Sequence, residues 1–308
     1  MAIPVSARRA WPTLWILLFW AGTSPAVSGD QPDLTYRTGT NEVRLAFSAS
    51  DQNDHGVATL KSNDFAVVDT GFIVRDYQSF TRSDYSRLEI AILIDSSESV
   101  TPEYRKEVSD ALTLLSDTAG VPEDNVSLLT FEGSKPALLC SGDCRSSNAL
   151  EKFPASHSGG LTPLFDSIVF ASDLMAQKED PQTEKVLIVF SDGNDTISLR
   201  SLTDARDSAI AHNVQIYGIA QDHSAGYSSG TQTLRALAAA TGGRCFKANN
   251  GATRALNLIL EDFRASYIVS YHLPTHARGF HTVQILPTHN RNLRFRSRSG
   301  YYYPEYIR

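Results

Sequence analysis

The sequence LEIAILIDSSES, residues 88–99, sets both the fold of the chain and the place where its polar side chains gather. The run from Leu88 to Ile94, which is apolar except for Glu89, has the length of a strand buried on both faces, and such runs are typical of parallel sheets. Asp95, Ser97 and Ser99 follow it, so three short oxygen-bearing side chains lie where the strand should end. The sequence therefore predicts a polar site at the carboxyl edge of a parallel sheet.

Apolar runs alternate with helical patterns from residue 88 onward. This alternation predicts an α/β fold, a doubly wound and mostly parallel sheet with helices on both faces. The expected strands are 88–95, 125–131, 185–191, 214–220 and a shorter one at 244–247, and the expected helices are 102–117, 164–177, 202–212, 233–240 and 253–264. Thr101–Pro102 and Thr162–Pro163 each provide an N-cap residue followed by a proline suited to the first helical position.

The two flanks of this region have the shorter, alternating patterns of antiparallel strands. They are expected at 42–50, 65–68 and 72–74 before it, and at 266–272, 281–286 and 293–298 after it. Because neither flank has enough strands for a core of its own, we expect both to pair into one small antiparallel β subdomain. The predicted organisation is a signal peptide at 1–28, an N-terminal flank at 29–86, a central domain at 87–265 and a C-terminal flank at 266–308.

The first residues have the pattern of an export signal. Arg8 and Arg9 precede the apolar stretch 11–20, and small residues follow through Ser28. The apolar stretch is well short of the roughly 20 residues that span a bilayer, so removal as a signal peptide is the favoured interpretation. We therefore expect an exported protein, either secreted, periplasmic or at the cell surface, with no transmembrane segment after cleavage.

Charge and cysteine content exclude some kinds of partner and site. The net charge is −6, with 28 basic against 34 acidic residues, which disfavours binding to the nucleic-acid backbone. The three cysteines do not have the spacing of a structural zinc site. Cys140 and Cys144 flank a turn-like Ser-Gly-Asp and could form a disulfide, but their spacing alone leaves this open. Cys245 is expected to be a buried apolar residue.

Two further segments add oxygen donors to the cluster after residue 94. Thr162 follows a glycine pair in the sequence GGLTP, and Asp192 follows the apolar run 186–190. Together with Asp95, Ser97 and Ser99 they make two carboxylates and three hydroxyls, a hard donor set that suits Mg²⁺.

A structural interpretation of these polar residues is also available. Serine, threonine and aspartate are favoured at helix starts and turns, so any one cluster could be a cap. Capping does not explain why all three clusters lie at the same edge of the predicted sheet, and the metal interpretation is favoured. Asp195 could supply outer-shell charge to the metal or could be a solvated turn residue.

These motifs resemble those of the von Willebrand factor type A (VWA) domains. The metal-ion-dependent adhesion site of that family has the pattern Asp-x-Ser-x-Ser, then a threonine, then an aspartate. Asp95, Ser97, Ser99, Thr162 and Asp192 match the whole pattern. The resemblance implies a six-stranded sheet with one short antiparallel edge strand, for which 137–140 is the candidate.

The flanks resemble a bacterial subgroup of exported VWA-related proteins. The residues that carry this resemblance are Asn63-Asp64-Phe65, Val67-Val68-Asp69, Phe263, Tyr267, Tyr271 and the closing Arg298-Ser299-Gly300-Tyr301-Tyr302.

The family resemblance implies a mechanism of binding rather than catalysis. The serines and the threonine would contact Mg²⁺, for which Mn²⁺ or Ca²⁺ could substitute, the aspartates would hold it directly or through water, and an Asp or Glu carboxylate of a protein partner would complete the octahedron. In some members, metal coordination is coupled to movement of the last helix, here 253–264. The predicted function is therefore an adhesion or assembly module without enzymatic activity.

Two other functions compete with this prediction. A Mg²⁺-dependent hydrolase or phosphatase would use the same ion, but the sequence has neither a Gly-x-Ser-x-Gly elbow nor a Walker glycine loop, and His157 is the one candidate general base. A structural component of a cell-envelope assembly, in which the ion stabilises the fold, is the third possibility.

Overall fold

The computed structural model describes residues 41–83, 88–97, 109, 113–115, 125–133, 135–142, 144, 161–178, 180, 183–221, 226–248 and 251–304. The predicted signal peptide, Ser99, His157 and most of the predicted helix 102–117 lie outside these ranges. No helix in the described ranges is both long enough and apolar enough to cross a membrane.

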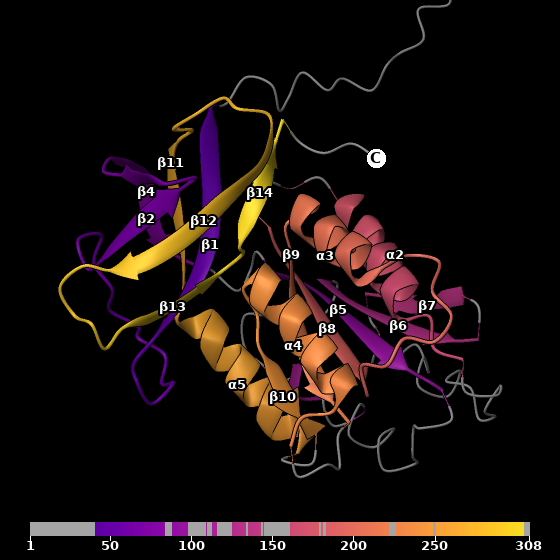
Figure 1. Ribbon diagram of the computed structural model, residues 1–308. Helices are drawn as coiled ribbons and strands as arrows, with labels where there is room; N and C mark the ends of the chain where they lie inside the picture. The colour runs from indigo at the N-terminus through magenta and orange to yellow at the C-terminus, as the bar shows by residue number, and fades with distance from the viewer. Residues whose placement is uncertain are drawn as a thin grey trace, which may run out of the picture. The chain divides into compact units, whose positions relative to one another are not determined.

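The centre of the fold is a six-stranded sheet in the order β10-β9-β8-β5-β6-β7 (Figure 1). Its strands are β5 (Leu88–Asp95), β6 (Val126–Glu132), β7 (Lys135–Ser141), β8 (Glu184–Ser191), β9 (Val214–Ala220) and β10 (Cys245–Lys247). All neighbours pair in parallel except β6 and β7, which are antiparallel. The prediction of an α/β fold with a mostly parallel central sheet is confirmed.

Helices cover both faces of this sheet, which explains why every residue of β5 and β8 is buried. The helices are α2 (Leu164–Ala176), α3 (Leu202–Ala211), α4 (Ser229–Thr241) and α5 (Ala252–Arg264). Apolar side chains of α2, α3 and α4 pack on one face, and those of α5 pack on the other. Helix α4 begins four residues before the predicted start because the Ser228 side chain accepts a hydrogen bond from the Thr231 amide and caps it.

Strands from both flanks form two further sheets, each antiparallel throughout. One has the order β13-β1-β11-β4 and contains β13 (Arg294–Ser297), β1 (Glu42–Ser50), β11 (Ser266–His272) and β4 (Tyr77–Arg82). The other has the order β14-β12-β2-β3 and contains β14 (Gly300–Tyr303), β12 (Gly279–Pro287), β2 (Phe65–Asp69) and β3 (Phe72–Val74). Strands β4 and β14 were not predicted.

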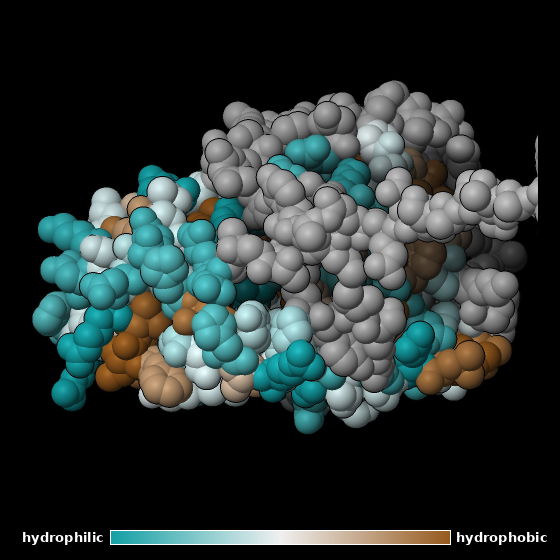
Figure 2. Space-filling model, turned by 90° about the horizontal axis from the view of Figure 1, so that it is seen from above, coloured by the Kyte–Doolittle hydropathy of each residue, from teal (hydrophilic) through white to brown (hydrophobic). Residues whose placement is uncertain are grey.

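The two flanking sheets share one core, in which aromatic rings dominate. Phe47 packs against Phe65 and Tyr267 with ring centroids 5.0 and 5.7 Å apart. The outer side of the second sheet keeps some apolar side chains at the surface, among them Ile73, Phe280 and Leu286. Figure 2 shows hydrophobic residues on the part of the molecule where Figure 1 places these strands.

A buried carboxylate joins the two flanking sheets. Asp69 on β2 is fully buried, and its Oδ2 accepts hydrogen bonds from the hydroxyls of Tyr271 on β11, at 2.9 Å, and Tyr301 on β14, at 2.7 Å. Burial, together with the Asp69 charge, raises the pKa of both tyrosines, so both remain protonated donors. His281 Nδ1 lies 3.2 Å from the Tyr301 hydroxyl and completes the cluster.

A second buried carboxylate connects α5 to the residue that precedes β10 and to the first flanking sheet. Asp262 in the last turn of α5 accepts from Arg244 Nε at 2.8 Å and Nη2 at 3.0 Å, and from Arg296 Nη2 on β13 at 2.6 Å. In addition, Arg82 on β4 donates to the carbonyl oxygen of Arg264 at 2.8 Å. The carboxyl end of α5 is therefore held by three arginine side chains, which come from Arg244 before β10, Arg296 on β13 and Arg82 on β4.

Replacing Tyr271 by Phe should destabilise the protein by about 1.5–3 kcal/mol, because it removes a hydrogen bond to a buried charge. The matched control is Tyr303→Phe, whose hydroxyl contacts His276 Nδ1 at 3.1 Å in an exposed position and should change stability by about 0.5 kcal/mol or less. Urea denaturation measures both. Equal losses for the two variants would show that the Asp69 cluster has no special role.

Candidate metal centre

Asp95 ends β5 and has no exposed surface. Its Oδ2 accepts a hydrogen bond from the Ser191 hydroxyl at 2.7 Å, and its Oδ1 accepts one from the Ser97 amide at 3.0 Å. The Ser97 side chain also hydrogen-bonds this carboxylate. These bonds fix the orientation of the carboxylate at the edge of the sheet.

Asp192 lies beside Asp95 because β5 and β8 are neighbours. Ile94 pairs with Phe190 in the parallel register, so the two strands end together and Asp192 follows β8 at the same edge as Asp95. Asp192 is partly buried, and its carboxylate accepts hydrogen bonds from the Asn194 amide at 2.9 Å and the Asn194 side chain at 3.1 Å.

Burial raises the pKa of Asp95, and the Asp192 charge adds to this effect, whereas the hydrogen bonds from Ser97 and Ser191 oppose it. The negative charges of Asp95, which is buried, and Asp192, which is partly buried, repel each other. A divalent cation between them would relieve both the repulsion and the loss of solvation.

The structure corrects the prediction that Thr162 caps helix α2. The N-cap residue is Pro163, and it makes no side-chain cap hydrogen bond. The amides of the first turn are instead bound by the Asp195 Oδ2 atom, 3.0 Å from Phe165 N, and by the Ser198 hydroxyl, 3.1 Å from Asp166 N. The first turn of α2 is thus capped by side chains of the loop after β8 and not by Thr162, which lies just before the helix.

Thr162 is 5% exposed, and none of the described residues hydrogen-bonds its hydroxyl. Its backbone is held on both sides, because Thr162 N donates to the Thr196 hydroxyl at 2.7 Å and Thr196 N donates to the Thr162 carbonyl at 2.9 Å. A nearly buried hydroxyl that takes no part in capping suits a metal ligand.

The loop between β8 and α3, residues 192–201, which we call the 192–201 loop, is fixed by side-chain carboxylates. Asp195 binds the Ser198 amide at 3.2 Å and the Ser198 hydroxyl at 2.5 Å, in addition to its bond with Phe165 N. Asp195 therefore has a structural role that connects this loop to α2. A contribution to the outer shell of a metal remains a prediction.

A pair of glycines allows α4 to approach this loop. Gly193 has φ of +82°, and a Cβ atom built on it would lie 2.1 Å from the Gly230 carbonyl oxygen. A Cβ atom on Gly230 would lie 2.2 Å from the Asp192 carbonyl oxygen. Only glycine fits at either position, so the backbone that carries Asp192 rests directly on the first turn of α4.

Sequence reasoning missed several residues that position the site. The sequence predicts Ser191 only as the last residue of a strand, although it directly precedes Asp192 and its hydroxyl donates a hydrogen bond to Asp95. Ser96 donates to the Phe131 carbonyl at 3.0 Å and receives a bond from the Thr130 hydroxyl at 2.8 Å. Thr130 lies on the neighbouring strand, and nothing in its local sequence signals this contact.

The structure thus brings four of the five predicted ligands, Asp95, Ser97, Thr162 and Asp192, to segments that meet at one edge of the sheet. The fifth, Ser99, lies outside the described residues. Within the described ranges, no group of three or more His, Cys, Asp or Glu side chains gathers as a metal site. The predicted donor set has only two carboxylates and depends on hydroxyls instead. Such a set fits a hard cation that retains several waters.

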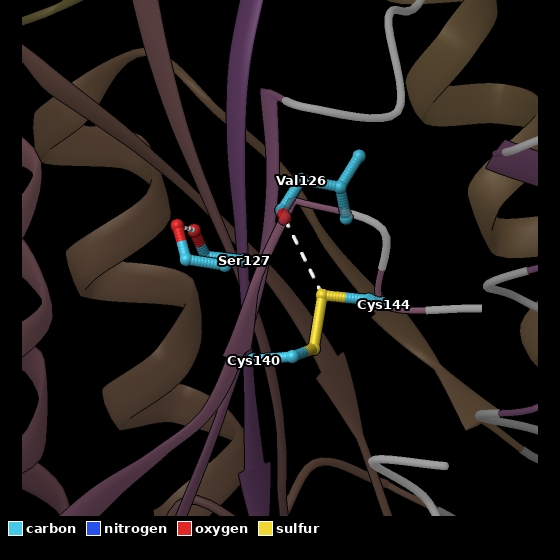
Figure 3. Close-up of a disulfide and its surroundings, with 5 residues drawn as sticks. Val126, Ser127, Cys140 and Cys144 are labelled. Carbon is cyan, nitrogen blue, oxygen red and sulfur yellow. Dashed lines mark hydrogen bonds between the residues drawn. A yellow bond between two sulfur atoms is a disulfide. The ribbon is translucent and has the colours of Figure 1, made fainter. Parts of the chain in front are cut away.

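A disulfide joins Cys140 on β7 to Cys144, with Cα atoms 5.5 Å apart (Figure 3). Cys144 is buried, and its Sγ lies 3.4 Å from the Val126 carbonyl oxygen on β6. The bridge therefore holds the chain after the edge strand against the sheet. Cys245 takes no part in this disulfide and is partly buried, which is less burial than predicted.

The family model of the von Willebrand factor type A domain matches residues 89–262 of this chain. The chain belongs to the von Willebrand factor type A domain family. The matched VWA region begins in β5 and ends in α5, so it contains Asp95, Thr162 and Asp192. VWA domains commonly act as metal-dependent protein-interaction modules.

Solved structures similar to this chain include two proteins from Bacteroides species and one from the mussel byssus. An aerotolerance-related membrane protein from Bacteroides fragilis has 16% identity and a TM-score of 0.42, over 57% of this chain and 98% of that chain. Proximal thread matrix protein 1 from the mussel byssus has 14% identity and a TM-score of 0.46, over 58% and 49%. The conserved hypothetical protein BatB from Bacteroides thetaiotaomicron has 15% identity and a TM-score of 0.40, over 56% and 98%. No curated protein matches the sequence.

Replacing Gly193 by Ala should destabilise the protein strongly, because the new methyl group would collide with the Gly230 backbone. Gly71→Ala is the matched control, since Gly71 has φ of +84° and a Cβ atom added there would meet no heavy atom within 4 Å. The control should lose about 1 kcal/mol for backbone strain alone, and Gly193→Ala should lose clearly more. Thermal unfolding of the two variants measures the difference. Equal losses would contradict the close approach of α4.

Proposed function

We propose that the chain is an exported, metal-dependent protein-binding module. Asp95, Ser97, Ser99, Thr162 and Asp192 would hold Mg²⁺, with Mn²⁺ or Ca²⁺ as possible substitutes, and the ion would bind an Asp or Glu carboxylate of a protein partner. The observation that carries the proposal is that Asp95 and Asp192 lie at the ends of two paired strands, with the Thr162 backbone hydrogen-bonded to Thr196 in the loop that Asp192 begins. The function would be adhesion or assembly.

The donor set supports binding of a partner carboxylate. The charges of Asp95 and Asp192 balance a divalent cation, and the hydroxyl ligands add no negative charge. When bound, the ion would supply a positive centre for the partner's carboxylate. Ser191 and the Ser97 amide hold Asp95 in place, and the 192–201 loop holds Thr162, so the protein groups are positioned before a metal or partner arrives.

Export is supported by the disulfide. A bridge between Cys140 and Cys144 persists in oxidising compartments and is rare in the cytosol. The signal-like pattern of the first 28 residues agrees with this location. These two features support the proposal that the protein is exported and is secreted, periplasmic or at the cell surface.

Metal binding should depend on both a carboxylate and a hydroxyl of the site. We expect isothermal titration calorimetry to detect Mg²⁺ or Mn²⁺ binding to the wild type and to detect none with Asp95→Ala or Thr162→Ala. Asp173→Ala is the control, because this carboxylate lies exposed on α2. Circular dichroism should show that Thr162→Ala retains the fold. Metal binding that survives both substitutions would contradict the proposed site.

Partner capture should require the same residues. In a pull-down from the native cell envelope, proteins retained with Mg²⁺ should be released by a chelator and absent with Asp95→Ala or Thr162→Ala. Capture that persists in the chelator and in both variants would overturn the proposal. Asp95-dependent turnover of phosphate or ester substrates would favour a hydrolase instead. A large fall in melting temperature on chelation, without any partner, would favour a structural role for the ion.

A further inference from the structure

Leu199 in the 192–201 loop is the most exposed large hydrophobic side chain among the residues that the structure describes, with 95% of its surface accessible. Single exposed leucines are common on protein surfaces and need no special explanation. Leu199 differs from such residues in two respects. Hydrogen bonds hold its backbone, and other exposed apolar side chains lie on the segments that carry the candidate metal ligands.

The backbone around Leu199 is fixed by a carboxylate of α2. Asp166 Oδ2 accepts a hydrogen bond from the Leu199 amide at 3.0 Å, and Asp166 Oδ1 accepts one from the Arg200 amide at 2.9 Å. On either side, Asp195 binds the Ser198 amide, and Asp204 binds the Ser201 amide at 2.9 Å. Four consecutive amides are thus bound by carboxylates, so a partner would bind Leu199 without first having to order the loop.

The neighbours of Leu199 on the same segments are also apolar and exposed. Leu161, which precedes Thr162, is 43% exposed, and Ile197 is 38% exposed. The two hydrogen bonds between Thr162 and Thr196 hold the segments that carry Leu161 and Ile197 together. Arg200 is exposed next to Leu199 and adds a positive charge. The surface therefore suits a partner that is both acidic and apolar.

This surface lies at the same edge of the sheet as the candidate metal ligands. Asp192 begins the 192–201 loop, and Thr162 is hydrogen-bonded to its middle. The helices that follow parallel strands begin at the carboxyl edge of the sheet, and the loop ends at the N-cap of α3. A protein segment bound at the metal would therefore pass close to Leu199.

We propose that Leu199, with Ile197 and Leu161, forms an apolar contact surface that selects protein partners carrying a large apolar residue next to the metal-binding carboxylate. This inference rests on the proposed function and adds a class of partner to it. The acidic residue would be recognised by the metal and Arg200, and its apolar neighbour by Leu199.

Random peptides displayed on phage and selected on the full chain with Mg²⁺ test this directly. We expect the selected peptides to carry an acidic residue with a large aliphatic or aromatic residue beside it. For synthetic copies, fluorescence polarisation should show that Leu199→Ala weakens binding about tenfold, as expected for one lost apolar contact. Ile73→Ala is the matched control, because Ile73 is 59% exposed on β3 in a flanking sheet, and it should not change affinity.

Replacing the apolar residue of the peptide by Ser provides the second half of the experiment. This peptide should bind wild type and Leu199→Ala equally, and calorimetry should give equal Mg²⁺ affinities for both proteins. Acidic peptides without an apolar neighbour, or an unchanged affinity in Leu199→Ala, would overturn the inference and leave the metal-dependent function standing. If none of the selected peptides requires both Mg²⁺ and Asp95 for binding, the proposed function is overturned. This inference then fails as well.

Discussion

The parallel pairing of β5 with β8 determines how the other elements are arranged. Both strands are buried along their whole length, so their backbone groups must hydrogen-bond within the sheet and their side chains must pack under helices on both faces. Polar residues lie at the carboxyl ends of both strands: β5 ends at Asp95, and β8 ends at Ser191 and is followed by Asp192. Two carboxylates, Asp95 and Asp192, are thereby placed side by side at a partly buried edge, where a divalent cation would compensate their charge.

Carboxylates that bind backbone amides fix the loops around this edge. Asp166, Asp195 and Asp204 each bind amides of the 192–201 loop, and Asp195 also caps α2. These three carboxylates therefore fix the loop, whereas Asp95 and Asp192, which also accept hydrogen bonds from nearby amides, are the carboxylates of the proposed ligand set. At the carboxyl end of α5, the contacts of Asp262 with Arg244 and Arg296 join this helix to the start of β10 and to the flanking sheet that contains β13.

The strands of the central sheet could be predicted from sequence because burial on both faces leaves a continuous apolar run. Strand β4 could not, because a register shift between Ser270 and Tyr271 on β11 places Tyr77 and Phe80, three positions apart, against the same aromatic core and removes the alternation. The capping of α2 was wrongly assigned to Thr162, because its true partners, Asp195 and Ser198, lie about thirty residues downstream. Each segment of the ligand pattern follows a recognisable local signal, an apolar run or a glycine pair, whereas the residues that position the ligands, such as Ser191 and Thr130, come into contact with these segments only in the fold.

Anomalous diffraction from crystals grown with Mn²⁺ would locate the metal without recourse to any partner. We predict one manganese peak per chain at the carboxyl edge of the sheet, coordinated by the Thr162 hydroxyl and the side chains that follow β5, with Asp192 beside it. A crystal with full Mn²⁺ occupancy elsewhere and none at this edge would contradict the proposed metal centre.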